Sequence, residues 1–227
     1  DQTAVIGSSD QPVKVKQIVF DAESDNADIR VAKERNFAGK TITAAKGSQT
    51  LTDLRADARK AIKYTEKNVE KDFPGDFTAR WKETPDINTV GTRKYKVQLT
   101  ETSTSRVDER EVTITVTNPA PAELTHENKQ NGTTRIKLPD DADKVVFTIP
   151  GDNQLNNVTA THSERDGWTV PANSVLTKDG DYLVVNSKDV GGTRKITAVA
   201  TKGDGNLKST ETPTSIAVPT HEVGTTK

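Results

Sequence analysis

The sequence predicts a mainly β fold that is divided into two domains, and three observations support this prediction. The β-branched residues Thr and Val, which favour strands, number 33 and 22. Short runs in which apolar and polar side chains alternate recur along the chain, separated by turns rich in Gly, Pro and Asp. Only 31% of the 227 residues are apolar, which favours two domains with thin cores over one domain with a deep core.

The composition excludes several classes of function. Because the chain has no cysteine, disulfides, thiolate metal sites and cysteine nucleophiles are excluded. The 32 basic residues balance the 33 acidic ones, so the chain has no long-range attraction for nucleic acid or an anionic membrane. No stretch approaches the roughly 18–20 apolar residues of a membrane span. The absence of methionine, even at residue 1, leads us to expect an excised or processed part of a longer protein.

A proline-rich segment divides the chain. Asn118-Pro119-Ala120-Pro121-Ala122 follows a strand-like run, and proline favours extended geometry in the residue before it. Two prolines so close together predict a short, fairly stiff linker. The predicted division is a frayed N-terminus at 1–10, a first domain at 11–118, a linker at 119–121 built on Pro119 and Pro121, a second domain at 122–218, and a tail at 219–227.

The first domain is predicted to be α+β, with one helix on a small antiparallel sheet. Apolar residues from Leu51 to Ile62 recur at steps of three and four, which predicts an amphipathic helix of about three turns. Thr50 or Thr52 is the expected cap of this helix. Strands are expected on either side of it, at 13–19, 28–33, 41–45, 77–81, 93–100 and 111–117.

The expected core of the first domain comes from the apolar faces of these elements. The helix contributes Leu54 and Ile62. The strands contribute their alternating apolar residues, and we expect the following side chains to be buried: Trp81, Tyr95, Val97, Leu99, Val112, Ile114 and Val116.

The second domain is predicted to be an all-β sandwich of the immunoglobulin-like type. Turn signals such as Asp179-Gly180 and Gly191-Gly192 recur between short strands at spacings near ten residues. Phe147 and Trp168 are its expected large core residues. Strands are expected at 133–138, 144–149, 158–162, 182–185, 194–201, 207–210 and 215–218.

Part of the first domain resembles a known family. The segments Trp81–Asp86, Gly91-Thr92, Tyr95–Thr100 and Val112–Val116 resemble the second half of a Rib-type domain. Upstream, Lys40–Gly47, a helix and a Pro74-Gly75 turn extend the resemblance to about residues 37–118. This chain departs from the family pattern at Glu101–Asp108, which is longer than the family's Tyr-Pro-Asp-Gly hairpin and lacks glycine. Residues 122–218 resemble the bacterial immunoglobulin-like modules that often lie beside such domains.

The resemblance implies a secreted, cell-wall-attached surface protein of Gram-positive bacteria, in a setting similar to the giant staphylococcal matrix-binding adhesins. It carries no catalytic residue, so we expect a non-enzymatic segment without a cofactor. The implied function is attachment to a host extracellular matrix protein, and fibronectin is the first partner to test. The resemblance does not indicate which residues would bind it. The alternative is a stalk that holds a distal binding domain away from the wall, in contact with neighbouring domains of the same chain.

The histidines and acidic clusters offer no catalytic or metal site by their spacing. His162-Ser163-Glu164 places triad residue types side by side, but neighbours on a strand point to opposite faces. His126 follows the linker and His221 lies in the tail. Two acidic stretches, Asp140–Asp143 and Lys202–Asn206, lack the spacing of a calcium-binding EF-hand loop. We interpret the first as a solvated loop and the second as a type I′ hairpin.

Three other groups of residues leave alternatives open. Lys144 or Lys195 could form an amide crosslink with Asn186, whereas the alternative is that these side chains face water. Trp81 and Trp168 could stack on a ligand, but each is expected to fill a core. The last group is a locally basic region, which is either a mixed solvated surface or a site for a heparin-like polysaccharide. Its basic residues are Arg30, Lys33, Arg35, Lys40, Arg55, Arg59, Lys60 and Lys63.

Overall fold

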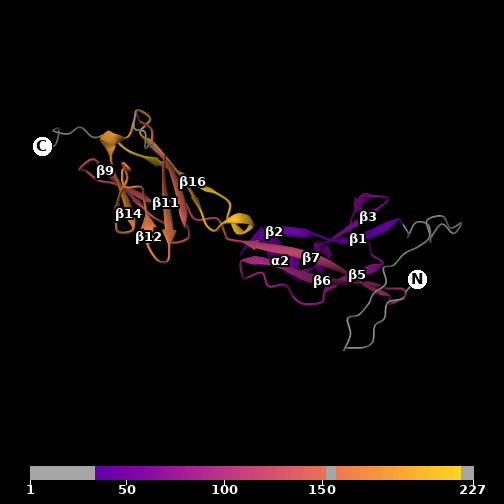
Figure 1. Cartoon of the computed structure of the whole chain (residues 1–227). Helices are drawn as coiled ribbons and strands as arrows, with labels where there is room; N and C mark the ends of the chain where they lie inside the picture. Colours follow the sequence, from indigo (N-terminus) through magenta and orange to yellow (C-terminus); the bar gives the residue numbers. More distant parts are fainter. Residues whose placement is uncertain (1–33, 152–156, 221–227) are drawn as a thin grey trace. The chain divides into compact units, whose positions relative to one another are not determined.

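A computed structural model describes residues 34–151 and 157–220. The chain forms two compact units, the first at Asp1–Thr117 and the second at Asn118–Lys227 (Figure 1). Both units consist mainly of strands, so the prediction of a mainly β fold is confirmed. The strands predicted at 13–19 and 28–33 lie outside the described residues.

The first unit has two sheets. A four-stranded sheet has the order β2-β7-β6-β5, and a three-stranded sheet has the order β1-β3-β4. One pair in the larger sheet, β2 with β7, is parallel, which differs from the antiparallel sheet that was predicted. The strand bounds are β1 Arg35–Gly39, β2 Thr41–Ala45, β3 Ile62–Glu66, β4 Val69–Lys71, β5 Phe77–Trp81, β6 Gly91–Glu101 and β7 Val107–Thr117.

One continuous run of chain joins the two sheets. At the junction, the Lys40 N–H donates to the carbonyl of Ala61 at 2.9 Å, and the Lys40 carbonyl accepts from the Thr113 N–H at 3.1 Å. The preceding residue is Gly39, where a Cβ atom would lie 1.7 Å from the Glu111 carbonyl oxygen. Only glycine fits this approach of two backbones. The absence of a side chain at residue 39 therefore allows β1 to continue into β2 alongside β7.

The predicted three-turn helix is shorter in the structure. Helix α2 spans Gln49–Ala56, and its cap is Ser48, whose hydroxyl accepts from the Leu51 N–H, rather than Thr50 or Thr52. The helix ends because Asp57 has extended geometry (φ −140°) and its carboxylate accepts from the Arg59 N–H. A short 3₁₀ helix, Ala58–Ala61, follows, and Ile62 then begins β3. The apolar spacing that starts in α2 thus continues through the 3₁₀ helix, which contains Ala58 and Ala61, to Ile62 at the start of β3.

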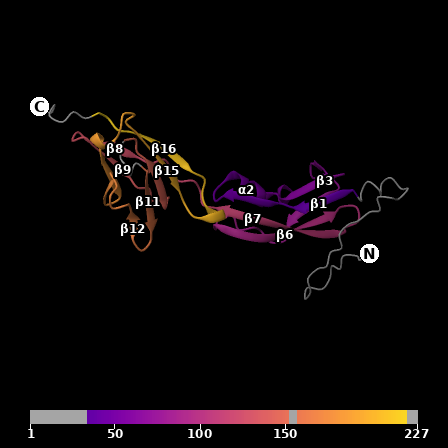
Figure 2. The same ribbon diagram turned by 45° about the horizontal axis from the view of Figure 1, so that its top comes forward.

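The core of the first unit lies between α2, the 3₁₀ helix and the sheets. Leu54, Ile62 and the predicted apolar residues of β6 and β7 are all buried, while Trp81 is half-buried and packs against them. An aromatic group that was not predicted forms at the other end of the unit, where Phe37 lies 4.8 Å from Tyr64 and 4.7 Å from Phe77 between ring centroids. In both views α2 and β3 lie toward opposite ends of this unit (Figure 1 and Figure 2).

The hairpin between β6 and β7 is tighter than predicted. The Glu101 N–H donates to the Arg106 carbonyl at 2.8 Å, and the Ser105 N–H donates to the Glu101 carbonyl at 2.8 Å. Ser105 takes the left-handed conformation (φ 60°) that a glycine would otherwise supply. Strand β7 therefore begins at Val107, four positions earlier than the predicted Glu111.

The second unit is a sandwich of two antiparallel sheets. The larger sheet has the order β12-β11-β10-β15-β16, and the smaller has the order β13-β14-β9-β8. Strands β8, β12 and β13 are short and were not predicted. The bounds are β8 His126–Asn128, β9 Thr133–Lys137, β10 Lys144–Thr148, β11 Asn157–Ser163, β12 Gly167–Thr169, β13 Thr177–Asp179, β14 Tyr182–Asn186, β15 Lys195–Thr201 and β16 Thr212–Ala217.

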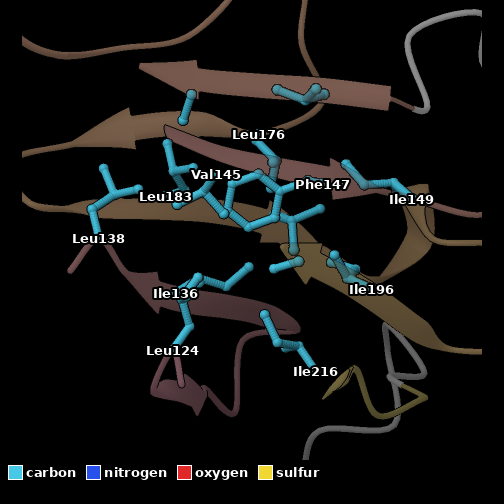
Figure 3. Packing of buried hydrophobic residues seen from close by; sticks show 14 of the residues in the cluster. Leu124, Ile136, Leu138, Val145, Phe147, Ile149, Leu176, Leu183, Ile196 and Ile216 are labelled. Carbon is cyan, nitrogen blue, oxygen red and sulfur yellow. The ribbon is translucent and has the colours of Figure 1, made fainter. Parts of the chain in front are cut away.

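The core of the second unit lies between its two sheets. The Phe147 ring occupies the centre, with Val145 and Ile196 from the larger sheet and Ile136 and Leu183 from the smaller one around it (Figure 3). Trp168 on the edge strand β12 is also buried. Alternation along each strand sends one set of side chains into this layer and the other toward water.

The strand predicted at 207–210 does not form. Residues Gly205–Leu207 make a 3₁₀ helix, and the Ser209 N–H donates to the Lys202 carbonyl at 2.8 Å. The Ser209 hydroxyl also accepts from the Lys202 N–H at 2.9 Å. A wide loop, closed by Ser209, therefore replaces the type I′ hairpin predicted at 202–206.

Candidate functional site

The two histidines in the part of the chain that the structure describes lie on separate strands and do not come together in one site. His126 and His162 are exposed on different strands, and the His162 ring lies 5.4 Å from the Trp168 ring between centroids. His221 lies outside the described residues. Within 34–151 and 157–220, no group of three or more His, Asp or Glu side chains is placed to hold a metal ion.

Two aspartates of the acidic stretch at 140–143 accept hydrogen bonds from the backbone of other loops. One carboxylate oxygen of Asp141 accepts from the Ala122 N–H at 2.9 Å, and one of Asp143 accepts from the Gly203 N–H at 3.0 Å. These bonds give both aspartates a structural role in the second unit, because each satisfies a backbone donor of a distant loop.

The geometry does not match an amide crosslink at the predicted positions. Lys144 and Lys195 are exposed on the outer face of the larger sheet. The Asn186 side chain accepts from the Lys188 N–H at 3.1 Å and caps a 3₁₀ helix at Ser187–Asp189. The two lysines face water, which was the alternative considered for these residues.

Both tryptophans contribute to packing. The Trp81 indole N–H donates to the Leu54 carbonyl at 3.0 Å, and its ring meets Tyr95 edge-on at 6.2 Å. This bond attaches the end of β5 to the last turn of α2. Trp168 is 8% exposed, with the His162 ring against it.

Two residues of the predicted basic surface, Arg35 and Arg59, pair with carboxylates. Arg59 pairs with Asp57 at 2.9 Å, and Arg35 pairs with Asp76 through two hydrogen bonds of 2.9 and 2.7 Å. Arg30 and Lys33 lie outside the described residues.

Arg35 is the centre of a hydrogen-bonded network that holds β1 and β3 against the loop before β5. Its Nε donates to the Tyr64 hydroxyl, which in turn donates to Glu66, each at 2.5 Å. Hydrogen bonds from Arg35 lower the pKa of Asp76, while burial and the hydrogen bond to Glu66 raise the pKa of Tyr64 to about 12. The network thus keeps Asp76 charged and Tyr64 neutral at ordinary pH.

A pocket of about 430 Å³ opens where β5 ends and β6 continues. Beyond Trp81, the Lys82 N–H makes one more bond to the Lys96 carbonyl, and the chain then leaves the sheet. The pocket lining combines one buried tyrosine with charged residues of both signs. It consists of Lys82, Glu83, Lys94, Tyr95, Lys96 and Glu111.

In the first unit, β2 and the last strand, β7, run parallel. Five register pairs join β2 to β7, from Thr41 with Thr113 to Ala45 with Thr117. Further bonds lie at both ends of the pairing, Thr113 N–H to Lys40 and Lys46 N–H to Thr117. Opposite pulls on the start of β2 and the end of β7 would therefore slide β2 along β7 and load the bonds of the ladder together.

The second unit also has a first segment that runs parallel to its last strand, but here hydrogen bonds that involve side chains join the two. Its entering segment, 121–128, meets β16 at three points: the Thr212 hydroxyl donates to the Pro121 carbonyl, the Leu124 N–H to the Thr214 hydroxyl, and the Asn128 side chain to the Ala217 carbonyl. Both sets of residue numbers rise together, so the two segments run parallel. Here, too, opposite pulls on the ends shear the first segment against the last strand.

Comparisons with known proteins show only distant likeness. No protein-family model and no curated protein matches the sequence. Similar solved structures include a SusE-like surface-located polysaccharide-binding protein from Bacteroides thetaiotaomicron, with a TM-score of 0.24 and 12% identity. Others are the FN1–FN3 domains of chicken CNTN1 (0.28, 7%) and the cadherin domains of protocadherin gamma B7 (0.24, 11%). The alignments cover 79%, 82% and 82% of this chain but 33%, 64% and 49% of those chains.

Among the described helices, none has the length and apolar character needed to cross a membrane.

Proposed function

We propose that this chain is a non-enzymatic, load-bearing segment of a cell-wall-attached surface protein of Gram-positive bacteria. In this proposal the first unit is the Rib-like domain and the second the immunoglobulin-like module, which meet at the Pro119–Pro121 segment. The parallel course of an early segment and the last strand in each unit carries the proposal. The likeness of residues 37–118 to Rib-type domains supports the surface setting.

The physical basis is the direction in which the bonds are loaded. When parallel strands are pulled from opposite ends, every bond of the ladder resists at once, whereas strands peeled from the same end lose their bonds one at a time. Forced unfolding is governed by the unfolding rate, so the shear arrangement lengthens the lifetime of each unit under tension. This is the property that a stalk between a wall and a bound surface requires.

Single-molecule force spectroscopy on the full chain tests the proposal. Because the sequence has no cysteine, paired cysteines define the points of attachment. Asn36→Cys with Ala120→Cys pulls β2 and β7 in shear, and Lys46→Cys with Ala120→Cys peels the same pair from one end. All three side chains are exposed.

We expect the unfolding force in the shear geometry to be several-fold higher than in the peeling geometry at the same loading rate. The proposal fails if the two geometries unfold the first unit at equal forces, because the parallel pair would then give no mechanical advantage.

Direct attachment to a host matrix protein such as fibronectin is the second candidate function, and the edge strand β4 favours it. All three residues of β4 are exposed and, among the described strands, β4 pairs only with β3. Val69 is the one large hydrophobic side chain exposed in the described residues, at 55%. A partner could therefore add a strand to this edge.

Surface plasmon resonance on immobilised fibronectin tests this second function. In the two-residue hairpin, the pair Glu66 with Val69 is hydrogen-bonded, so the Glu70 N–H points away from β3. Glu70→Pro blocks the open edge without breaking the hairpin, and Glu70→Ala is its control. Loss of saturable binding in the proline variant alone supports edge pairing. Absence of binding by the unaltered chain rules out direct adhesion to fibronectin.

A further inference from the structure

The pocket beside the end of β5 has a charge balance that identifies the kind of ligand it suits. Lys82 pairs with Glu109 at 2.6 Å, and Lys96 approaches the same carboxylate at 3.8 Å. Lys94 lies 3.5 Å from Glu111. The lining holds three lysines and two glutamates, and Glu109, which pairs with Lys82 and Lys96 without lining the pocket, brings the local formal charge to zero.

In two of these ion pairs, Lys94 with Glu111 and Lys96 with Glu109, the N···O distances of 3.5 and 3.8 Å are too long for good hydrogen bonds. The opposite charges are still close enough to compensate each other. The side chains of Lys94 and Lys96 are 66% and 55% exposed, and that of Glu111 is 53% exposed. The pocket therefore presents donors and acceptors side by side, which a ligand can engage without displacing a buried ion pair. Tyr95 also lines the pocket, but its side chain alternates with those of Lys94 and Lys96 and is buried in the core, where its hydroxyl accepts from the Asp86 N–H at 3.0 Å.

The surface beside the pocket continues this chemistry as a row of hydroxyl groups. Residues opposite one another in register share a face of the sheet. Lys94 lies opposite Thr113, and Thr113 lies opposite Thr41 on β2. In the next row, the hydroxyls of Thr92 and Thr115 lie 2.8 Å apart. Thr41 is exposed and Thr113 half-buried, whereas Thr115 is buried, so the accessible hydroxyls on this face are those nearest the pocket.

We propose that this pocket binds sugar residues of an uncharged polysaccharide. A sugar hydroxyl both donates and accepts, so it uses the lysines and the glutamates together. The volume of about 430 Å³ lies within the range of roughly 300–1,000 Å³ typical of small-ligand sites. A polyanion would gain from the lysines but be repelled by the carboxylates. A peptide would lack an exposed apolar anchor on this face.

NMR titration of the ¹⁵N-labelled full chain tests the proposal. The probes are the hexasaccharides maltohexaose, cellohexaose, chitohexaose and mannohexaose, with dextran sulfate as the anionic comparison. We expect at least one uncharged probe to give saturable shifts at the amides of Lys82, Glu83 and Lys94–Lys96, with a Kd on the order of 1 mM. Because the pocket is neutral, this Kd should change by less than about twofold between roughly 50 and 500 mM NaCl.

A charge-neutral double variant separates the pocket from the rest of the surface. Lys94→Ala with Glu111→Ala should weaken binding by at least about fivefold, since it removes a donor and an acceptor worth about 1 kcal/mol together. The matched control is Lys129→Ala with Glu127→Ala, which removes an exposed ion pair of 2.5 Å in the second unit and should leave binding unchanged. Unchanged thermal unfolding shows that each variant is folded.

Three outcomes overturn the proposal. The first is the absence of saturable shifts at the pocket with every uncharged probe. The second is an equal loss of binding in both double variants. The third is a preference for dextran sulfate that weakens steeply with salt, which would make the face a site for anionic polymers instead.

Discussion

Replacing Gly39 by alanine should destabilise the first unit far more than a glycine-to-alanine change elsewhere in the same unit. The added Cβ would lie 1.7 Å from the Glu111 carbonyl oxygen and 2.6 Å from its carbon, both of which are backbone atoms. An ordinary C···O contact is roughly 3.3 Å, so β1 would have to retreat from β7 by about 1.6 Å. No side-chain rotation can relieve this clash.

The cost can be estimated from the contacts at this junction. The shift would break or lengthen the two hydrogen bonds of Lys40, one to the 3₁₀ helix before β3 and one to β7, each worth about 1 kcal/mol. Overpacking of a filled region adds about 1–3 kcal/mol. The free energy of unfolding of the first unit should therefore fall by about 3–5 kcal/mol.

Urea unfolding, followed by Trp81 fluorescence in a Trp168→Phe background, measures this change. The control is Gly75→Ala, because a Cβ at Gly75 would have no atom within 4 Å. That variant should be neutral or more stable by up to about 1 kcal/mol, since alanine restricts the unfolded chain. If Gly39→Ala and Gly75→Ala unfold within about 0.5 kcal/mol of each other, the close approach of β1–β2 to β7 is not what the structure describes.

Three further predictions concern pH, the second core and force. Because Arg35 lowers the pKa of Asp76 in the folded state, the stability from this pair is present above pH about 4 and is lost as pH falls through the folded pKa; urea unfolding from pH 2 to 5 should show a smaller loss in Asp76→Asn, and an identical loss would contradict the assignment. Phe147→Ala should cost the second unit about 3–5 kcal/mol, read from Trp168 fluorescence, with the first unit unchanged. Under end-to-end tension the second unit should yield first, because side-chain bonds rather than a strand ladder join its entering segment to β16; the reverse order would show that the ladder of the first unit does not control its resistance.

Much of the fold could be predicted because alternation is a local signal. The prediction placed β5 at its observed bounds and β6 and β10 within two residues, since each has a clear apolar face and a turn beside it. The sandwich of the second unit was predicted from the same signal. Strand β4, in which every residue is exposed, was missed for lack of such a face, and β3 was missed because its first residue, Ile62, was assigned to the helix.

The remaining errors have physical causes that local patterns do not contain. Ala58, Ala61 and Ile62 continue the helical spacing of α2, but the Asp57 carboxylate offers the backbone another partner and ends the helix. The parallel pairing of β2 with β7 depends on residues about seventy positions apart, which alternation within one strand cannot identify. Gly39 gives no pattern at all, because its role comes from the backbone that passes beside it.

The candidate site was the hardest part to predict. Lys82, Lys94, Lys96 and Glu111 are ordinary charged residues on the outer faces of strands. They form a pocket only because β5 ends at Trp81 while β6 continues along β7. Tyr95 was predicted as a core residue, and it is buried, yet it is also one of the residues that line this pocket.

The pairing of β2 with β7 also has a consequence for how the protein is made. As the chain leaves the ribosome or a secretion channel, β2 emerges early and exposes an edge whose partner is about seventy residues away. Closing so large a loop costs entropy before any bond repays it, and non-local pairing of this kind slows folding. The four-stranded sheet cannot be completed until Thr117 has emerged, so the first unit should remain open to proteases and chaperones until then.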